Sequence, residues 1–77
     1  MKVWINYVKG AYQSGLALIA ADSSVEAHKC LLETSEEEYP DIDIHKSFFE
    51  LNGWKQVHEL TANVSKPTIL GITSHDG

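Results

Sequence analysis

Histidine and cysteine are the residues of this chain with the most obvious chemistry, because both are common zinc ligands. There is one cysteine, Cys30, and there are four histidines, His28, His45, His58 and His75. Residues two positions apart on a helix point to opposite sides, so His28 and Cys30 are not expected to share a metal ion. The other histidines lie in separate predicted elements. We therefore expect no metal and no other cofactor, and a small metal- or ligand-binding enzyme that uses the histidines stays an alternative.

Cys30 itself is predicted to lie on the core-facing side of a helix. A buried cysteine usually behaves as a small apolar residue, and burial raises the pKa of its thiol, so a catalytic thiolate is not expected. A single cysteine also cannot form an internal disulfide, which excludes a disulfide-stapled secreted scaffold.

The most polarised stretch runs from Glu33 to Asp43, where six carboxylates occur without a basic residue. Paired carboxylates cleave glycosidic bonds when a scaffold holds them at a set distance, but this stretch has the composition of a loop. We predict no catalytic residue here and interpret the stretch as a solvated acidic surface and candidate partner-binding site. Its candidate contact residues, called the acidic segment below, are Glu36, Glu37, Glu38, Asp41 and Asp43.

The charge balance indicates which partners to expect. The 77 residues have eleven acids against six bases and a net charge of −5, and every base is a lysine. Nucleic acid is not an expected partner, because the charge repels phosphate and no guanidinium fork is present to bind base edges. The N-terminus is too polar for a signal peptide, and no apolar run approaches the roughly 20 residues that span a bilayer. We expect one cytoplasmic domain, residues 1–77, without a membrane partner.

A buried strand that leads directly into a capped helix organises the chain. Residues 16–21 form a continuous apolar run, typical of a strand with both faces at least partly covered. Ser23 and Glu26 match a capping box, in which the Ser23 hydroxyl accepts from the Glu26 amide and the Glu26 carboxylate accepts from the Ser23 amide. The helix is predicted from about Ser24 to Thr34. Its core-facing residues are Ala27, Cys30, Leu31 and Thr34, flanked by Val25 and Leu32, with His28, Lys29 and Glu33 toward solvent.

Three further strands are predicted. In residues 2–8, Val3, Ile5 and Tyr7 share one side of a half-buried strand, and an irregular connection, residues 9–15, joins it to residues 16–21 as an antiparallel hairpin. Residues 54–61 predict a strand, residues 62–67 a turn, and residues 68–73 a final strand with a bulge at Gly71. Residues 74–77 are expected to fray.

The segment from residue 43 to residue 52 supports two interpretations. Ile44, Phe48 and Leu51 have helical spacing, Asp43 is a suitable N-cap, and Asn52-Gly53 is a suitable end. The alternative is an extended loop that fills the core with Phe48 and Phe49.

These elements predict an α+β fold with a small, mostly antiparallel sheet in the order β-β-α-(α)-β-β and one main helix packed on one face. Residues 1–8, 54–61 and 68–73 are expected to be outer strands. Their free edges give a second copy a place to pair, so a homodimer through sheet edges is one expected assembly.

The stretch Tyr12-x-Ser-Gly-Leu-Ala-Leu-Ile-Ala-Ala-Asp-Ser-x-x-Glu-Ala27 resembles one found in short uncharacterised proteins of gut bacteria and their phages. In those proteins a Trp-bearing strand and a late proline followed by a strand come next, and residues 54–60 and 67–72 are the counterparts here. The resemblance covers about half of the chain. It implies a small intracellular protein, and it brings no activity, cofactor or catalytic residue with it.

The function that we expect is binding of another protein by a small acidic domain without enzymatic activity. Two features indicate this function: the acidic segment and the free sheet edges. An acidic inhibitor that mimics phosphate and occupies the basic site of a nucleic-acid-handling protein is the second hypothesis. Its contact would be the acidic segment.

Overall fold

The computed structural model describes residues 1–76 and confirms the α+β fold. Within these residues four strands form one sheet: β1 (Lys2–Lys9), β2 (Gln13–Ala21), β3 (Trp54–Thr61) and β4 (Thr68–Asp76). Between β2 and β3 the chain forms α1 (Ser24–Glu33), α2 (Ile42–Lys46) and a short 3-10 helix, η1 (Leu51–Gly53). The order along the chain is therefore the predicted one, with α2 much shorter than α1.

The β1–β2 hairpin forms the centre of the sheet. The strand order is β3-β1-β2-β4, and every neighbouring pair is antiparallel. The prediction that residues 1–8 form an outer strand is wrong, because β3 pairs with the other side of β1 and leaves β3 and β4 as the edges. The hairpin connection is also tighter than predicted. Pairing continues to Lys9 and Ser14, and the Gly10 amide donates to the Gln13 carbonyl at 2.8 Å.

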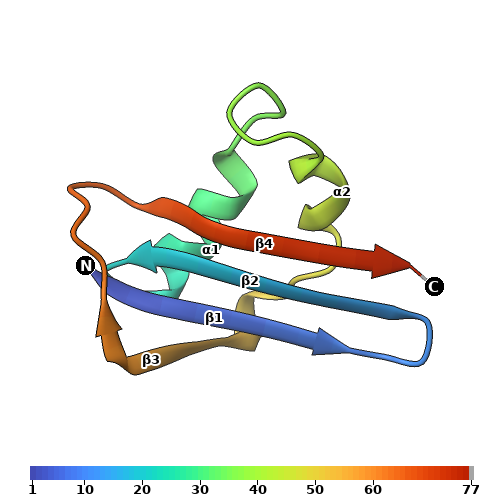
Figure 1. Cartoon of the computed structure of the whole chain (residues 1–77), viewed down its shortest axis with the longest axis horizontal. Helices are drawn as coiled ribbons and strands as arrows, with labels where there is room; N and C mark the ends of the chain where they lie inside the picture. The colour runs from blue at the N-terminus through green and yellow to red at the C-terminus, as the bar shows by residue number, and fades with distance from the viewer. Residues whose placement is uncertain (77) are drawn as a thin grey trace.

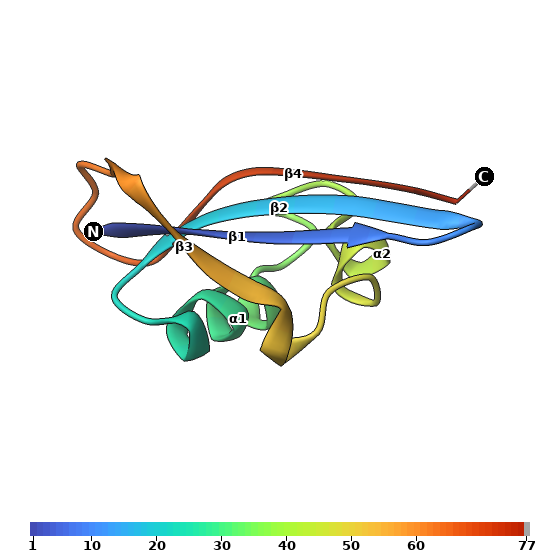
Figure 2. The ribbon, with the colours of Figure 1, turned by 90° about the horizontal axis from the view of Figure 1, so that it is seen from below.

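The sheet divides the molecule into a covered side and an open side. Both α-helices lie against one side, and no helix of residues 1–76 lies on the other (Figure 1 and Figure 2). Since residues directly opposite each other in the register share a face, Trp4 and Ile19 lie on the covered side with Asn6 and Ala17. The core between the sheet and the helices consists of Ala17, Ile19, Ala21, Ala27, Leu31, Ile42, Phe49, Trp54 and Ile72.

Asn6 is a buried polar residue on this covered side. Its side-chain amide donates to the Glu50 carbonyl at 2.9 Å and so attaches the segment before η1 to the central strand. Gly53 packs directly on it, and a Cβ at position 53 would come within 2.6 Å of the Asn6 Oδ1. Burial of Asn6 therefore depends on a hydrogen-bond partner and on a glycine that leaves it room.

The ends of α1 agree closely with the prediction. The Ser23 hydroxyl accepts from the Glu26 amide at 3.2 Å, as expected of an N-cap. The Glu26 carboxylate, however, accepts from the Asp22 amide at 3.3 Å and not from that of Ser23, so this half of the predicted capping box is wrong by one residue. The helix ends at Glu33, and Thr34 is its C-cap.

The face of α1 that meets the sheet is narrower than predicted. Ala27 and Leu31 are fully buried, which confirms the centre of the apolar stripe. The predictions for Val25 and Leu32 are wrong, since these side chains are 63% and 51% exposed. A helix that lies against one sheet buries the side chains along its contact line, and side chains beside that line stay in water. His28, predicted to face solvent, is half-buried instead.

The segment between α1 and β3 combines the two interpretations. A helix forms, but it covers only residues 42–46, follows Asp41 in a left-handed backbone conformation and includes Asp43 within its first turn, so Asp43 is not the cap. The predicted stripe is wrong, because Ile44 and Leu51 are exposed. The loop that follows α2 fills the core with the buried Phe49, as the alternative proposed.

β4 is longer than predicted. It continues to Asp76, so residues 74–76 do not fray, and Gly77 lies outside the described residues. The β2–β4 register shifts between Leu18, which faces Gly71, and Ile19, which faces Ile69. This irregularity confirms the predicted bulge at Gly71.

Candidate binding surfaces

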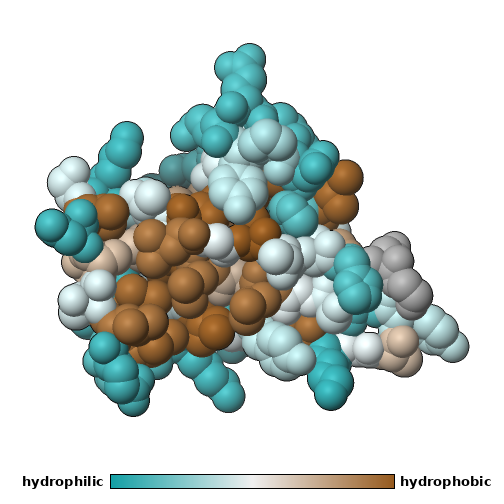
Figure 3. All heavy atoms as spheres, viewed as in Figure 1, coloured by the Kyte–Doolittle hydropathy of each residue, from teal (hydrophilic) through white to brown (hydrophobic). Residues whose placement is uncertain are grey.

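The open side of the sheet carries a cluster of neighbouring apolar side chains. Figure 3 views the molecule from this side and shows apolar side chains gathered over its left and centre, with more polar side chains toward the hairpin end on the right. Three directly facing pairs on β1 and β2 form its centre, and a valine of β3 extends it. These residues, called the open face below, are Val3, Ile5, Tyr7, Leu16, Leu18, Ala20 and Val57.

Exposure of the open face increases toward the hairpin. At one end Val3 and Ala20 are buried, although neither belongs to the core under the helices. At the other end Leu16 is 39% exposed and Tyr7 is 63% exposed. At the bulge, Leu70 is also exposed. Contiguous apolar surface of this kind marks interaction sites more often than single exposed apolar residues do.

Part of the open face could be recognised from the sequence. The alternation of Val3, Ile5 and Tyr7 on one side of residues 2–8 is confirmed by the register. Nothing in that alternation indicated which side the helices cover, and the more apolar side of β1 is the open one. The side under the helices includes Asn6, whose polarity is compatible with burial only because Glu50 supplies an acceptor. The side of β1 that the helices cover is therefore decided by tertiary contacts, which the alternation does not show.

The acidic segment lies in the loop from α1 to α2 and the first turn of α2, beyond the β4 edge of the sheet (Figure 1). All five predicted residues are exposed. The Glu36 carboxylate accepts hydrogen bonds from the amides of Asp41 and Asp43 at 2.7 and 3.1 Å. The Glu38 carboxylate accepts from the Ser35 hydroxyl at 3.3 Å.

A third carboxylate of the segment, that of Asp43, pairs with the Lys46 ammonium at 3.0 Å. Several of the charges predicted for a partner therefore stabilise their own loop. The remaining acids are also kept away from the sheet: of eleven acidic residues, only Glu59 and Asp76 lie in strands. Most acidic side chains thus lie away from the apolar side of the sheet.

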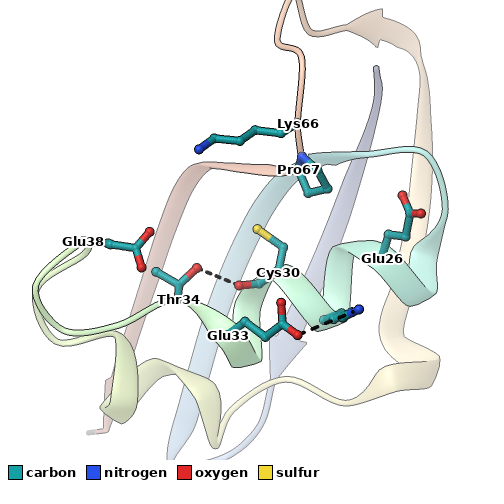
Figure 4. A pocket seen from close by; sticks show the side chains of 8 residues that line it. Glu26, Cys30, Glu33, Thr34, Glu38, Lys66 and Pro67 are labelled. Atoms are coloured by element: carbon teal, nitrogen blue, oxygen red, sulfur yellow. Dashed lines mark hydrogen bonds and ion pairs between the residues drawn. The ribbon is translucent and has the colours of Figure 1, made fainter.

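A shallow groove of about 430 Å³ lies between α1 and the connection that leads into β4. The Cys30 side chain points from α1 toward Pro67 (Figure 4). Burial raises the pKa of the Cys30 thiol above its ordinary value of 9.0, the carboxylates of Glu38 and Glu33 act in the same direction, and a hydrogen bond with Thr34 opposes them. This direction agrees with the one predicted from sequence, and a raised pKa lowers the fraction of thiolate at neutral pH.

The four histidines are dispersed. The Trp54 indole N–H donates to His28 Nδ1 at 3.0 Å, and His45 Nδ1 is hydrogen-bonded to the Ser74 hydroxyl, so these two residues attach α1 to β3 and α2 to β4. His58 and His75 are exposed on the two edge strands. Among residues 1–76, no three histidine, cysteine or acidic side chains are grouped so that they could hold a metal ion.

Comparison with known proteins found no match to a protein-family model, to a curated protein or to a solved structure. The resemblance to short proteins of gut bacteria and their phages therefore stays a prediction. Within residues 1–76, every helix is too short or too polar to cross a lipid bilayer.

Proposed function

We propose that this chain is a non-enzymatic protein-binding module and that the open face is its binding surface. The observation that carries the proposal is the contiguous apolar surface on the side of the sheet opposite the helices. Apolar area that leaves water on association is the main favourable contribution to most protein–protein contacts. Tyr7, with a large ring and a polar hydroxyl, is of a residue type enriched in such contacts.

The construction of the sheet supports this role. The open face lies mainly on β1 and β2, and each of these strands is hydrogen-bonded on both sides. Its side chains are therefore presented by backbone that is already ordered, so association requires little further loss of conformational entropy. The free, half-buried Cys30 thiol is also compatible with a reducing cytoplasm, the compartment that we propose and that cell fractionation would test.

Site-specific photo-crosslinking tests the open face as a binding surface. Benzoylphenylalanine replaces Tyr7 in one variant and Val25 in another, which is a matched control because both side chains are 63% exposed and Val25 lies on α1. Irradiation in a lysate of the producing cells is expected to cross-link the position-7 variant to protein, and the position-25 variant much less. Equal labelling at the two positions, or none at position 7, would contradict the proposal.

An acidic surface for a basic partner is the second candidate function, and the segregation of acids away from the sheet supports it. A phosphate-mimicking inhibitor of a nucleic-acid-handling protein is the specific form of this idea. The test is the affinity for a synthetic arginine-rich peptide at low and high salt. Replacing Glu37 and Asp41 with Gln and Asn should weaken binding at low salt, whereas the control Glu59→Gln on β3 should not. Unchanged affinity in the double variant would exclude the acidic segment as the contact.

A further inference from the structure

We propose that the partner of the open face is a second copy of this chain, packed sheet against sheet so that two open faces enclose one apolar layer. This inference rests on the proposed function, because it names the partner of the same surface. It differs from the homodimer expected from sequence, which used strand edges. The edges β3 and β4 stay free in the arrangement proposed here.

The size of the sheet fits a small symmetric dimer. The strands are eight or nine residues long. Four strands about 4.8 Å apart and about 26 Å long outline roughly 500 Å² per copy, or roughly 1,000 Å² for two copies, and this outline includes the end where Val3 and Ala20 are already buried. Specific interfaces need about 1,000 Å² in total, a lower bound that only the whole outline of the sheet reaches, so the dimer is expected to be weak. Two sheets of the same twist also pack face to face readily, as in β-sandwiches.

The distribution of charge favours a copy of the same chain. Two molecules of charge −5 repel each other unless the apposed surfaces lack acids. The seven apolar residues of the open face are uncharged, and the register adds the basic Lys55, opposite Ile5, to the same side, so the charge found there is not acidic. The helices lie on the other side of the sheet, and the acidic segment lies beyond its β4 edge (Figure 1 and Figure 2). Sheets packed face to face lie about 10 Å apart, and the Debye length is about 8 Å at physiological ionic strength, so repulsion between the two outer sides is weakened by salt.

The symmetry of the contact follows from its composition. A twofold axis between the two sheets places the same residues on both sides of the interface, which suits a surface with an apolar centre on β1 and β2. Ile5 and Leu18 lie at the middle of the central hairpin, and Tyr7 and Leu16 lie nearer its turn. Water leaves a patch that each monomer otherwise exposes.

Sedimentation equilibrium of the full chain, from low micromolar to millimolar concentration, tests the proposal. The wild-type protein is expected to dimerise, and Leu16→Lys and Tyr7→Lys should each raise the dimer dissociation constant at least about tenfold, because each places an unpaired charge in an apolar layer. Leu32→Lys and Val25→Lys on α1 are the controls, with comparable exposure, and should leave the constant unchanged. Circular dichroism verifies that each variant is folded. Added salt should preserve or strengthen the dimer, since apolar contacts are not screened.

A wild-type protein that stays monomeric over the whole range would overturn the second copy as partner. A dimer that survives both open-face substitutions would do the same and would place the contact elsewhere. Photo-crosslinking of purified protein separates this failure from that of the proposed function. If position 7 labels another protein in lysate but not a second copy of the pure chain, only the homodimer is wrong. Without labelling at position 7 in either setting, the open face is not a binding surface.

Discussion

The hairpin end of the open face and the acidic segment are both exposed, but their side chains are held in different ways. On the open face, strand register positions the apolar groups, and Tyr7 and Leu16 at the hairpin end stay exposed. In the acidic segment, the exposed groups themselves hold the backbone: Glu36 accepts from two amides, and Asp43 pairs with Lys46. Exposure alone therefore does not identify a binding site. A group that already has its partners inside the chain loses them when it binds another molecule, whereas an apolar group in water has no such contact to lose.

The largest expected effect is a difference in stability between substitutions on the two sides of β2. Ile19 is fully buried under the helices, and Leu16 lies on the open face. Ile19→Ala should lower the free energy of unfolding by about 2–5 kcal/mol, through lost burial and the cavity left behind. Leu16→Ala should cost only about 1–2 kcal/mol at a concentration where the chain is monomeric, because 39% of this residue is already exposed to water. Urea denaturation measures both, and equal losses would show that the open face serves folding as much as the covered side does.

Asn6 gives the next largest effect, because it carries a polar group into the covered side. Asn6→Ala leaves the Glu50 carbonyl without its donor and should cost about 1–3 kcal/mol. The exposed Asn52 is the control, and Asn52→Ala should change stability by no more than about 0.5 kcal/mol. If denaturation midpoints of the two variants coincide, the Asn6 hydrogen bond does not contribute as inferred.

Local features of this fold were predictable from sequence because they depend on neighbours in the chain. The Ser23 cap, the bounds of β3 and the bulge at Gly71 all follow from turn chemistry, alternation or glycine. The strand order and the side that the helices cover depend instead on contacts between residues far apart in sequence. The prediction of an outer first strand failed for that reason, since its pairing with β3 joins residues about 50 positions apart.

The candidate sites show the same limit. The exposure of the acidic segment could be predicted from sequence, because its residues are consecutive or nearly so, and its role in binding stays a prediction. It could not show that Glu36 would bind the amides of Asp41 and Asp43, nor that His28 would accept from Trp54. The open face was missed as a unit, because its seven residues come from three strands whose order was not known.

Within the acidic segment, a comparison of Glu36 with Glu37 distinguishes a carboxylate that stabilises its own loop from one that is available to a partner. Glu36→Gln weakens two hydrogen bonds to backbone amides and should cost about 0.5–1 kcal/mol, whereas Glu37→Gln should be neutral within about 0.5 kcal/mol. Each substitution removes one unit of charge, so the long-range attraction of a basic peptide should fall by a similar amount in both. Thermal unfolding together with peptide titration checks this, and a neutral Glu36→Gln would mean that the loop does not need this carboxylate.

Substitutions that affect Cys30 give the smallest expected change in stability. They test whether Glu38 of the acidic segment changes the pKa of a thiol in the same molecule. Burial first, and then the carboxylates of Glu38 and Glu33, raise the pKa of the thiol in the folded state above 9.0. As pH rises past 9.0, the unfolded chain releases this proton before the folded chain does, so stability falls with increasing pH in this window. The wild type should therefore lose stability at alkaline pH relative to Cys30→Ala, and a thiolate absorbance titration should give a midpoint above 9.0. Glu38→Gln should lower that midpoint slightly, because it removes one repelling charge but not the burial. A midpoint at or below 9.0 would show that the groove is more hydrated than its geometry indicates.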